Sequence, residues 1–428
     1  MKLNRKKQVP IATNNKINFI KPDRITLDNN IPLYAFNAGI QDVIKIDFIF
    51  NAGVWYQEKN LVSSATISML NEGTKNLSSF QIAEKLDYYG AYLTYNVEHD
   101  KAIVTLYSLS KYMEETLNIF ADIILNPIFP ANEFEIYLKK RKQSFIVENS
   151  KAKSLAHKKF QEVIFSENCP YGRKTVVEDF DNLELQQIRE FYGQHYNSKN
   201  CDIIISGKFD KNILSLLNKL FGQSSWDKTV MPVEKNVSIN SSLEKKHFVL
   251  KENSIQSAIR IGKLCINEQH IDFQSMKILN VLFGGYFGSR LMKNIREEKG
   301  YTYGIGSVLV PLQNSGFFVI VAETATEYCK KAVNEIYFEI EKLKQDLVKP
   351  NELDTVKNYI LGDLMRNFDG AFALADSYRL ILDFKLNSNY YEKYVEQIKS
   401  ITPLELNKIA TKYLVADKMY EVIVGNRY

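Results

Sequence analysis

The segment LELQQI at residues 183–188 recurs as LELNKI at residues 404–409, an offset of 221. Each copy leads through a tyrosine-containing helical pattern into a short apolar run that ends on glycine, IIISG in the first and VIVG in the second. Two further matches keep the same order: NEFE recurs as NELD at an offset of 219, and Gly90 recurs as Gly300 at an offset of 210. Loop insertions explain the drift between offsets, so the sequence predicts two similar halves.

Each half has the pattern of a mixed helix-and-strand fold. Residues 44–50 largely alternate apolar and polar side chains, which is the period of a half-buried strand. Ser78 and Gln81 form a capping-box pattern, and the apolar helical face that follows ends at Gly90. Because strands fall in hairpins between long helical runs, we expect an α+β fold. Each half should be a mainly antiparallel sheet covered by helices on one face.

The boundary between the two halves is expected at residues 223–246. This stretch is rich in Ser, Asn, Lys and Glu and lacks clear periodicity, as an exposed linker would. A length of 428 residues suits two domains. The predicted division is an N-terminal α+β domain at 1–222, a linker at 223–246 and a homologous C-terminal α+β domain at 247–428.

Composition and charge exclude several classes of protein. The net charge of +5 is small for 428 residues, and the densest basic run, at residues 1–7, is typical of a solvated terminus rather than a nucleic-acid-binding stripe. No apolar run resembles a membrane span or a signal peptide. The four cysteines form no CxxC pair, which favours a reducing compartment. We therefore expect a cytoplasmic protein without nucleic-acid or membrane partners.

Two tracts resemble a known family. Residues 284–307, GGYFGSRLMKNIREEKGYTYGIGS, contain a glycine-rich turn, a helix ending in an Arg-Glu pair and a Gly-x-x-Tyr strand start. Residues 69–93, MLNEGTKNLSSFQIAEKLDYYGAYL, resemble the tract that follows a family zinc motif. In this order the tracts resemble the insulinase/pitrilysin/processing-peptidase family. The signature residues are Gly284, Gly285, Gly288, Arg296, Gly300 and Tyr303.

The chain departs from this family at the metal motif. Active members carry H-x-x-E-H, in which two histidines on one helical face bind zinc and the glutamate activates the zinc-bound water. Counted back from the GT at residues 73–74, these positions hold Ser64, Ile67 and Ser68. Serine hydroxyls are poor zinc ligands, and isoleucine cannot move a proton, so the motif is degenerate.

Other residues do not restore the motif. The third, acidic ligand of the family aligns near Ser144 or Phe145, with only Glu148 close by. No two of the five histidines lie within five residues of each other, so neither H-x-x-E-H nor H-E-x-x-H occurs. These histidines are His99, His157, His195, His247 and His270. We expect this chain to bind no metal or other cofactor itself.

The resemblance implies a division of labour between two chains. In family members that work as pairs of half-length chains, one chain lacks the zinc motif and its partner carries the metal. The resemblance implies that Arg296 and Tyr303 reach a peptide lying on the partner's zinc, and that Gly284, Gly285 and Gly288 in the adjoining turn belong to the same substrate-binding site. This chain would be the non-catalytic, substrate-binding or regulatory subunit of a heterodimeric zinc metallopeptidase acting on peptides. Its partner would be a zinc-bearing homologue of similar length.

Simpler interpretations of the same residues stay open. Arg296 could form a surface ion pair with Glu297 or Glu298, and Tyr303 could be a core aromatic residue. The whole chain could be a structural homologue without a peptidase role, or a peptidase with an unconventional metal site. A phosphate-binding loop fits poorly, because the glycine pattern is GGxxG outside a βαβ unit.

The first half also differs where the family binds substrate. Active members offer an exposed strand edge there, to which an extended peptide adds. The corresponding strand is expected at residues 91–97, and Thr94 falls where active members usually place an asparagine. We therefore expect the first half to bind peptides differently from an active member.

Overall fold

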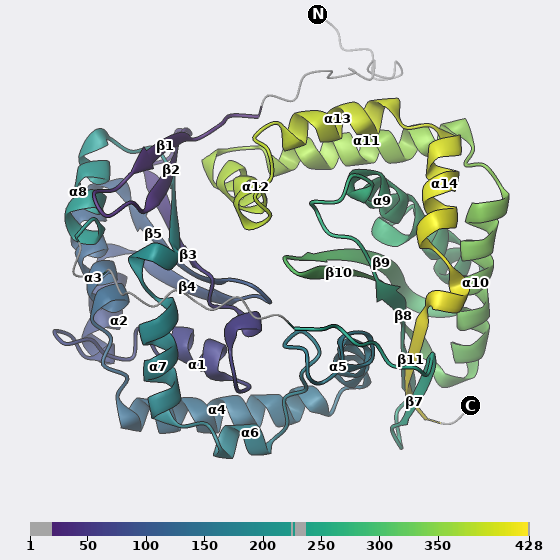
Figure 1. Cartoon of the computed structure of the whole chain (residues 1–428), viewed down its shortest axis with the longest axis horizontal. Coiled ribbons are helices and arrows are strands. Elements are labelled where there is room, and N and C mark those ends of the chain that lie inside the picture. The colour runs from purple at the N-terminus through teal and green to yellow at the C-terminus, as the bar shows by residue number, and fades with distance from the viewer. Residues whose placement is uncertain (1–18, 224–225, 227–236, 427–428) are drawn as a thin grey trace, which may run out of the picture.

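The computed structural model describes residues 19–223, 226 and 237–426 (Figure 1). The basic run at residues 1–7 and half of the expected linker, residues 224–225 and 227–236, lie outside the described residues. The strands are β1 (Asp23–Thr26), β2 (Pro32–Asn37), β3 (Val43–Phe50), β4 (Tyr92–Val97), β5 (Ala102–Leu109), β6 (Cys201–Gly207), β7 (Lys246–Leu250), β8 (Gln256–Leu264), β9 (Thr302–Leu312), β10 (Ser315–Ala325) and β11 (Tyr420–Gly425).

Helices connect these strands in long runs. The α-helices are α1 (Val62–Ser68), α2 (Ser79–Tyr89), α3 (Met113–Leu125), α4 (Ala131–Asn149), α5 (Ala152–Phe165), α6 (Glu178–Asp181), α7 (Leu185–His195), α8 (Lys211–Phe221), α9 (Phe273–Asn280), α10 (Cys329–Gln345), α11 (Pro350–Asn367), α12 (Ala371–Asp383), α13 (Tyr390–Ser400) and α14 (Pro403–Tyr413). Two π-helical segments are η5 (Val281–Gly285) and η6 (Met292–Glu298). Within the described ranges, no helix combines the length and the apolar character that crossing a membrane requires.

Two sheets share one strand order. The first sheet is ordered β1-β2-β6-β3-β5-β4 and the second β7-β11-β8-β10-β9. β2 and β6 run parallel, as do β7 and β11, and the other pairs in both sheets are antiparallel. Apart from the edge strand β1, the second sheet repeats the first strand for strand. This confirms the predicted α+β fold with two mainly antiparallel sheets, whereas the domain boundaries stay a prediction.

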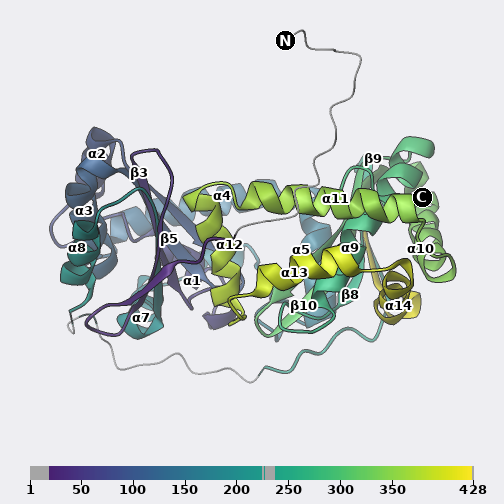
Figure 2. The same cartoon turned by 90° about the horizontal axis from the view of Figure 1, so that it is seen from above.

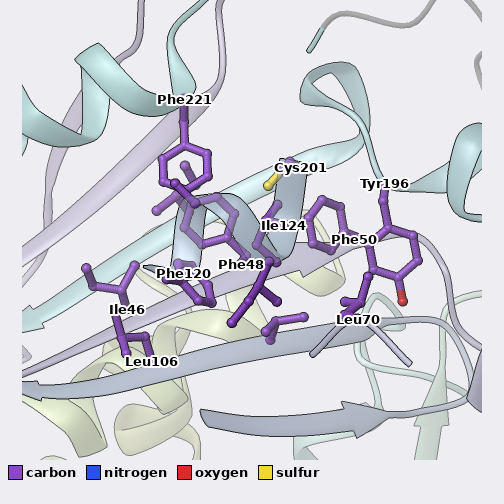
Figure 3. Packing of buried hydrophobic residues seen from close by; sticks show 14 of the residues in the cluster. Ile46, Phe48, Phe50, Leu70, Leu106, Phe120, Ile124, Tyr196, Cys201 and Phe221 are labelled. Atoms are coloured by element: carbon purple, nitrogen blue, oxygen red, sulfur yellow. The ribbon is translucent and has the colours of Figure 1, made fainter. Parts of the chain in front are cut away.

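The core of the first half lies between one face of its sheet and a layer of helices. The alternation in β3 turns Phe48 and Phe50 to this face, where both are fully buried. The Phe48 ring packs on Phe120 of α3 and Phe221 of α8, with centroids 5.1 and 4.5 Å apart (Figure 3). Full burial of such a side chain contributes about 1.5–3 kcal/mol, so this layer fixes which face of the sheet carries the polar residues of β3.

Each half also places one helix on the other half. α5 of the first half packs Phe160 on the second sheet beside Val422 of β11. α12 of the second half packs Leu374 on the first sheet beside Ile204 of β6. Figure 2 shows α12 lying against the first sheet. The sequence predicted helices on one face of each sheet, and these exchanged helices cover part of the second face.

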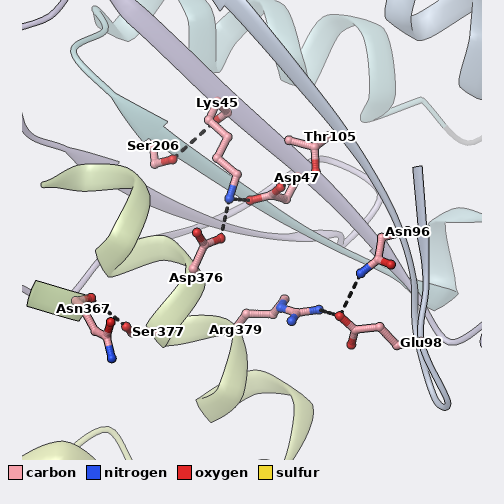
Figure 4. A network of polar contacts seen from close by, with 10 residues as sticks. All are labelled: Lys45, Asp47, Asn96, Glu98, Thr105, Ser206, Asn367, Asp376, Ser377 and Arg379. Carbon is pink, nitrogen blue, oxygen red and sulfur yellow. Dashed lines mark hydrogen bonds and ion pairs between the residues drawn. The ribbon is translucent and has the colours of Figure 1, made fainter. Parts of the chain in front are cut away.

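Ion pairs fix α12 on the first half (Figure 4). Lys45 of β3 pairs with Asp376 of α12 and lies 3.1 Å from Asp47. Arg379 of α12 lies 2.8 Å from Glu98, just beyond the end of β4. The side chains of Lys45 and Asp47 are only 5% and 6% exposed, so removing either partner would strand a buried charge. These ion pairs therefore fix the position of α12 on the first half.

Candidate functional site

A π-helical turn brings the glycine-rich segment against β9. Gly284 lies so close to β9 that a Cβ atom there would sit 2.5 Å from the Oγ of Ser307 and 2.6 Å from its amide nitrogen. A Cβ at Gly288 would sit 2.8 Å from the Tyr286 ring, and Gly285 is less crowded. Gly284 therefore lets the π-helical turn approach the backbone of β9 more closely than a residue with a side chain would allow. The role of the three glycines in substrate binding stays a prediction.

Arg296 lies near the end of η6. The wide π-turn closes where the amide of Lys299 donates to the carbonyl of Asn294 at 3.1 Å, and Gly300 follows with φ of 66°. That left-handed conformation favours glycine, as it does at Gly90, where φ is 64°. Single π-turns are frequent at functional sites because they change the direction of a side chain within a helix.

Tyr303 is the extra residue of a β-bulge in β9. Thr302 pairs with Thr324 of β10 and Gly304 pairs with Glu323, so Tyr303 has no partner across the ladder. A bulge re-aims the side chain of its extra residue, and Tyr303 is 89% exposed. The alternative that Tyr303 is a core aromatic residue is therefore wrong.

The half-buried Arg296 contacts the exposed rings of Tyr303 and Phe287, and we call these three residues the cation–aromatic cluster. The guanidinium carbon of Arg296 lies 4.7 Å from the Phe287 ring centroid and 5.4 Å from the Tyr303 centroid. No ion pair or hydrogen bond joins this guanidinium to any residue that the structure describes, so the alternative pair with Glu297 or Glu298 is absent. Sequence reasoning missed Phe287, although an aromatic residue between the signature glycines was a usable signal.

The degenerate metal-motif positions lie on α1. Ser64 donates its hydroxyl to the carbonyl of Leu61 at 3.0 Å. Ile67 is 2% exposed and belongs to the core of the first half, while Ser68 is half-buried. None of these side chains supplies the imidazole, thiolate or carboxylate that zinc takes in proteins. The residues on α1 therefore do not fit the ion that the motif holds in active members.

The region of the expected third ligand is equally unsuited. Phe145 of α4 is buried against Phe180, with ring centroids 5.1 Å apart, and the Lys158 ammonium lies 3.9 Å from its ring centroid. Ser144 and Glu148 are exposed on the same helix. Across the described ranges, no group of three or more His, Cys, Asp or Glu side chains is placed to hold a metal ion.

The strand expected at residues 91–97 lies at the edge of the first sheet. β4 pairs with β5 on one side, and its side chains alternate between exposed and half-buried. Thr94 stands opposite Thr105 in this ladder. The strand therefore lies at a sheet edge, as expected, and its part in peptide binding stays a prediction.

Comparisons with known proteins agree with this geometry. The family model described as Insulinase (Peptidase family M16) matches residues 46–172, and the model described as Peptidase M16 inactive domain matches residues 182–360. The first range contains α1 with the degenerate positions, and the second contains the cation–aromatic cluster. Together the two matches cover most of the chain.

Relatives and solved structures extend the likeness over the full length. The chain is 27% identical to an uncharacterized zinc protease of Rickettsia felis, over 79% of this chain and 82% of the relative. It is 23% identical to the non-peptidase homolog YmxG of Helicobacter pylori, over 98% and 95%. A solved structure described as a peptidase M16 inactive domain from Pseudomonas fluorescens matches with a TM-score of 0.85 and 22% identity, covering 96% of this chain and 99% of that one. Two family models in order, over one shared two-sheet fold, place this chain in the insulinase family of peptidases, family M16.

Proposed function

We propose that this chain is a non-catalytic, substrate-binding subunit of a heteromeric zinc peptidase that acts on peptides. One observation carries the proposal. The Arg296 guanidinium contacts the exposed rings of Phe287 and of the bulged Tyr303 and has no carboxylate partner among the described residues. A guanidinium without a carboxylate partner keeps its N–H donors available to a ligand, whereas an ion pair would occupy them.

The chemistry of the two side chains suits a peptide under attack. A peptide carbonyl gains negative charge on oxygen as water adds to it, and preorganised donors that meet this charge accelerate the step. Arg296 offers five N–H donors and Tyr303 one hydroxyl donor, and neither reads the side chains of the peptide. In the proposed assembly the zinc and its general base belong to a partner homologue of similar length. This chain contributes hydrogen-bond donors and helps to bind the peptide backbone.

Three further observations support the proposal. The positions of the metal motif hold side chains that do not bind zinc, as described above for α1 and α4. One full-length relative is named a non-peptidase homolog. The four cysteines are free thiols and three of them are buried, which suits a reducing compartment such as the cytoplasm.

The test is reconstitution with a companion protein. The chain is co-purified from its native source, and the companion is checked for H-x-x-E-H. Peptide cleavage is then measured for each protein alone and for the mixture. We expect activity only in the mixture, with kcat lowered about 10²-fold by Arg296→Ala and by a similar factor by Tyr303→Phe, the usual cost of one oxyanion donor.

Two matched variants control for general damage to the surface. Lys293→Ala removes an exposed cation from η6, and Tyr88→Phe removes the hydroxyl of a tyrosine that is 80% exposed on α2. Both should leave activity unchanged. Full activity of the Arg296/Tyr303 double variant would exclude the proposed role and favour a structural homologue. Cleavage by the lone chain, with zinc bound stoichiometrically, would favour an unconventional metal site.

A further inference from the structure

Phe287 is exposed where a phenylalanine could have been buried. It lies in the turn between η5 and η6, and its ring is 62% exposed. Its neighbour Tyr286 turns to Tyr359 of α11 instead, with ring centroids 4.8 Å apart. The contact that holds the Phe287 ring is with the Arg296 guanidinium, at 4.7 Å. Single exposed apolar residues are common, so exposure alone is no argument, but contact with an unpaired cation is specific.

The internal repeat gives a second, independent observation. At the offset of 210 that aligns Gly90 with Gly300, the three residues of the cation–aromatic cluster align with three leucines, Leu77, Leu86 and Leu93. All three leucines pack against the core of the first half. The second half therefore has polar or exposed side chains at three positions that serve the core in the first. Phe287 departs from the core pattern together with the two predicted site residues.

We infer that Phe287 is a positioning and specificity-determining residue for peptide binding at the cation–aromatic cluster. Its ring fixes the guanidinium plane next to Tyr303, so that the donors face one direction. The outer face of the same ring forms an apolar surface beside the bound peptide backbone. This surface favours peptides that carry an apolar side chain next to the ring. This inference rests on the proposed function, because it assigns the substrate class of the same site.

The two tasks of the ring separate by substitution. Phe287→Tyr keeps the aromatic ring and should preserve both its contact with the guanidinium and its apolar surface. Phe287→Leu keeps an apolar surface but removes the aromatic face that contacts the cation. Phe287→Ala removes both. The matched control is Phe80→Ala, because Phe80 of α2 is 73% exposed and has no cation over its ring among the described contacts.

The experiment measures binding of two labelled, unstructured peptides of equal length to the full chain by fluorescence anisotropy. One peptide carries three leucines, and the other carries serines at those positions. We expect the leucine peptide to bind the wild type about 10-fold more tightly. Phe287→Ala should weaken it about 10-fold and the serine peptide about 3-fold, and Phe287→Leu should weaken both about 3-fold with the preference kept. Phe287→Tyr and Phe80→Ala should match the wild type.

A second measurement reports only on the position of the Arg296 side chain. In chain labelled with ¹³C-arginine, the δ-methylene protons of Arg296, assigned from Arg296→Lys, should show upfield ring-current shifts that Phe287→Leu reduces. If Arg296→Ala and Tyr303→Phe leave binding of both peptides unchanged, or if the wild type binds neither, the proposed function and this inference both fall. If Arg296→Ala weakens binding while Phe287→Ala changes neither affinity nor preference, this inference alone is overturned.

Discussion

The corner formed by α2 and β4 in the first half corresponds to the corner formed by η6 and β9 in the second. In the first corner an α-helix with a capping box ends at Gly90, and β4 pairs with β5 without interruption. In the second corner a π-helix precedes Gly300, and a bulge interrupts the pairing of β9. Both strands occupy the same edge of the same strand order. The scaffold is shared, and the local backbone differs.

This difference shows how one copy of a repeated fold can expose side chains at positions that the other copy uses for its core. Arg296 and Tyr303 align with Leu86 and Leu93, which pack in the first core. A π-turn changes the phase of a helix, and a bulge adds one residue to a strand, so each irregularity redirects the side chains next to it. Two positions that would otherwise point into a core thereby become available at the surface.

The largest expected effect tests this asymmetry directly. Leu86 is 7% exposed, so Leu86→Ala should lower the free energy of unfolding by about 2–5 kcal/mol. Arg296→Ala removes only exposed cation–ring contacts and should lower it by about 1 kcal/mol or less. Urea unfolding of both variants measures the difference. Equal losses at the two positions would contradict the view that they serve a core in one half and a site in the other.

The sequence carried enough information for the fold and for part of the site. The repeat offsets aligned Gly90 with Gly300, and both adopt the same left-handed conformation, so the offsets matched equivalent backbone positions. The signature tract placed Arg296 and Tyr303 close together, as the structure does. The π-turn and the bulge were not predictable, because a shift of one hydrogen bond leaves no residue-type pattern. The exchange of α5 and α12 was not predictable either, since an apolar helical face does not reveal which sheet it covers.

The exchanged helices provide a second contrast between the halves. α5 packs on the second sheet mainly through apolar side chains around Phe160. α12 combines an apolar patch with charged side chains, including Asp383, whose carboxylate lies 3.8 Å from the Lys101 ammonium. At that distance the pair is not a hydrogen bond, and the carboxyl group is largely buried. Burial raises the pKa of Asp383 to about 6, and the nearby Lys101 opposes this shift.

The raised pKa of Asp383 predicts the direction in which stability changes with pH. An aspartate titrates near 3.9 in the unfolded chain, so between about pH 4 and pH 6 the folded state holds a proton that the unfolded state releases. The contribution of Asp383 to stability is therefore greatest below pH 4 and falls by up to about 3 kcal/mol as the pH rises through 6. The unfolding free energy of the wild type minus that of Asp383→Asn should decrease between pH 4 and pH 7. A flat difference would contradict the burial of this carboxyl group.

A control of opposite sign is available in the same half. Hydrogen bonds from Lys412 and Tyr413 lower the pKa of Asp272. The stabilising contribution of Asp272 is present above the unfolded pKa and is lost as the pH falls. The difference between the wild type and Asp272→Asn should therefore increase with pH over the acidic range. Parallel slopes for the Asp383 and Asp272 variants would show that a general charge effect dominates.

A smaller effect tests the close approach in the second corner. At the offset of 210, Gly284 aligns with Thr74, whose side chain accepts a hydrogen bond from the amide of Leu77 at 2.9 Å. The first half thus tolerates a side chain where the second half does not. Gly284→Ala places a methyl group 2.5 Å from the Oγ of Ser307 and should lower the unfolding free energy by about 1–3 kcal/mol. Thermal unfolding that matches the wild type would mean that η5 does not pack on β9 as described.

The smallest expected effect has the opposite sign, and it separates the contact of Gly284 with β9 from the general effect of alanine. Gly362 lies exposed within α11, and a Cβ atom there would meet nothing within 4 Å. Alanine restricts the unfolded chain and favours the helix, so Gly362→Ala should raise the unfolding free energy by about 0.5–1 kcal/mol. Because the same substitution is made at both glycines, a loss at Gly284 together with a gain at Gly362 assigns the loss to the contact with β9. Losses at both positions would instead indicate that alanine is unfavourable for a reason unrelated to that contact.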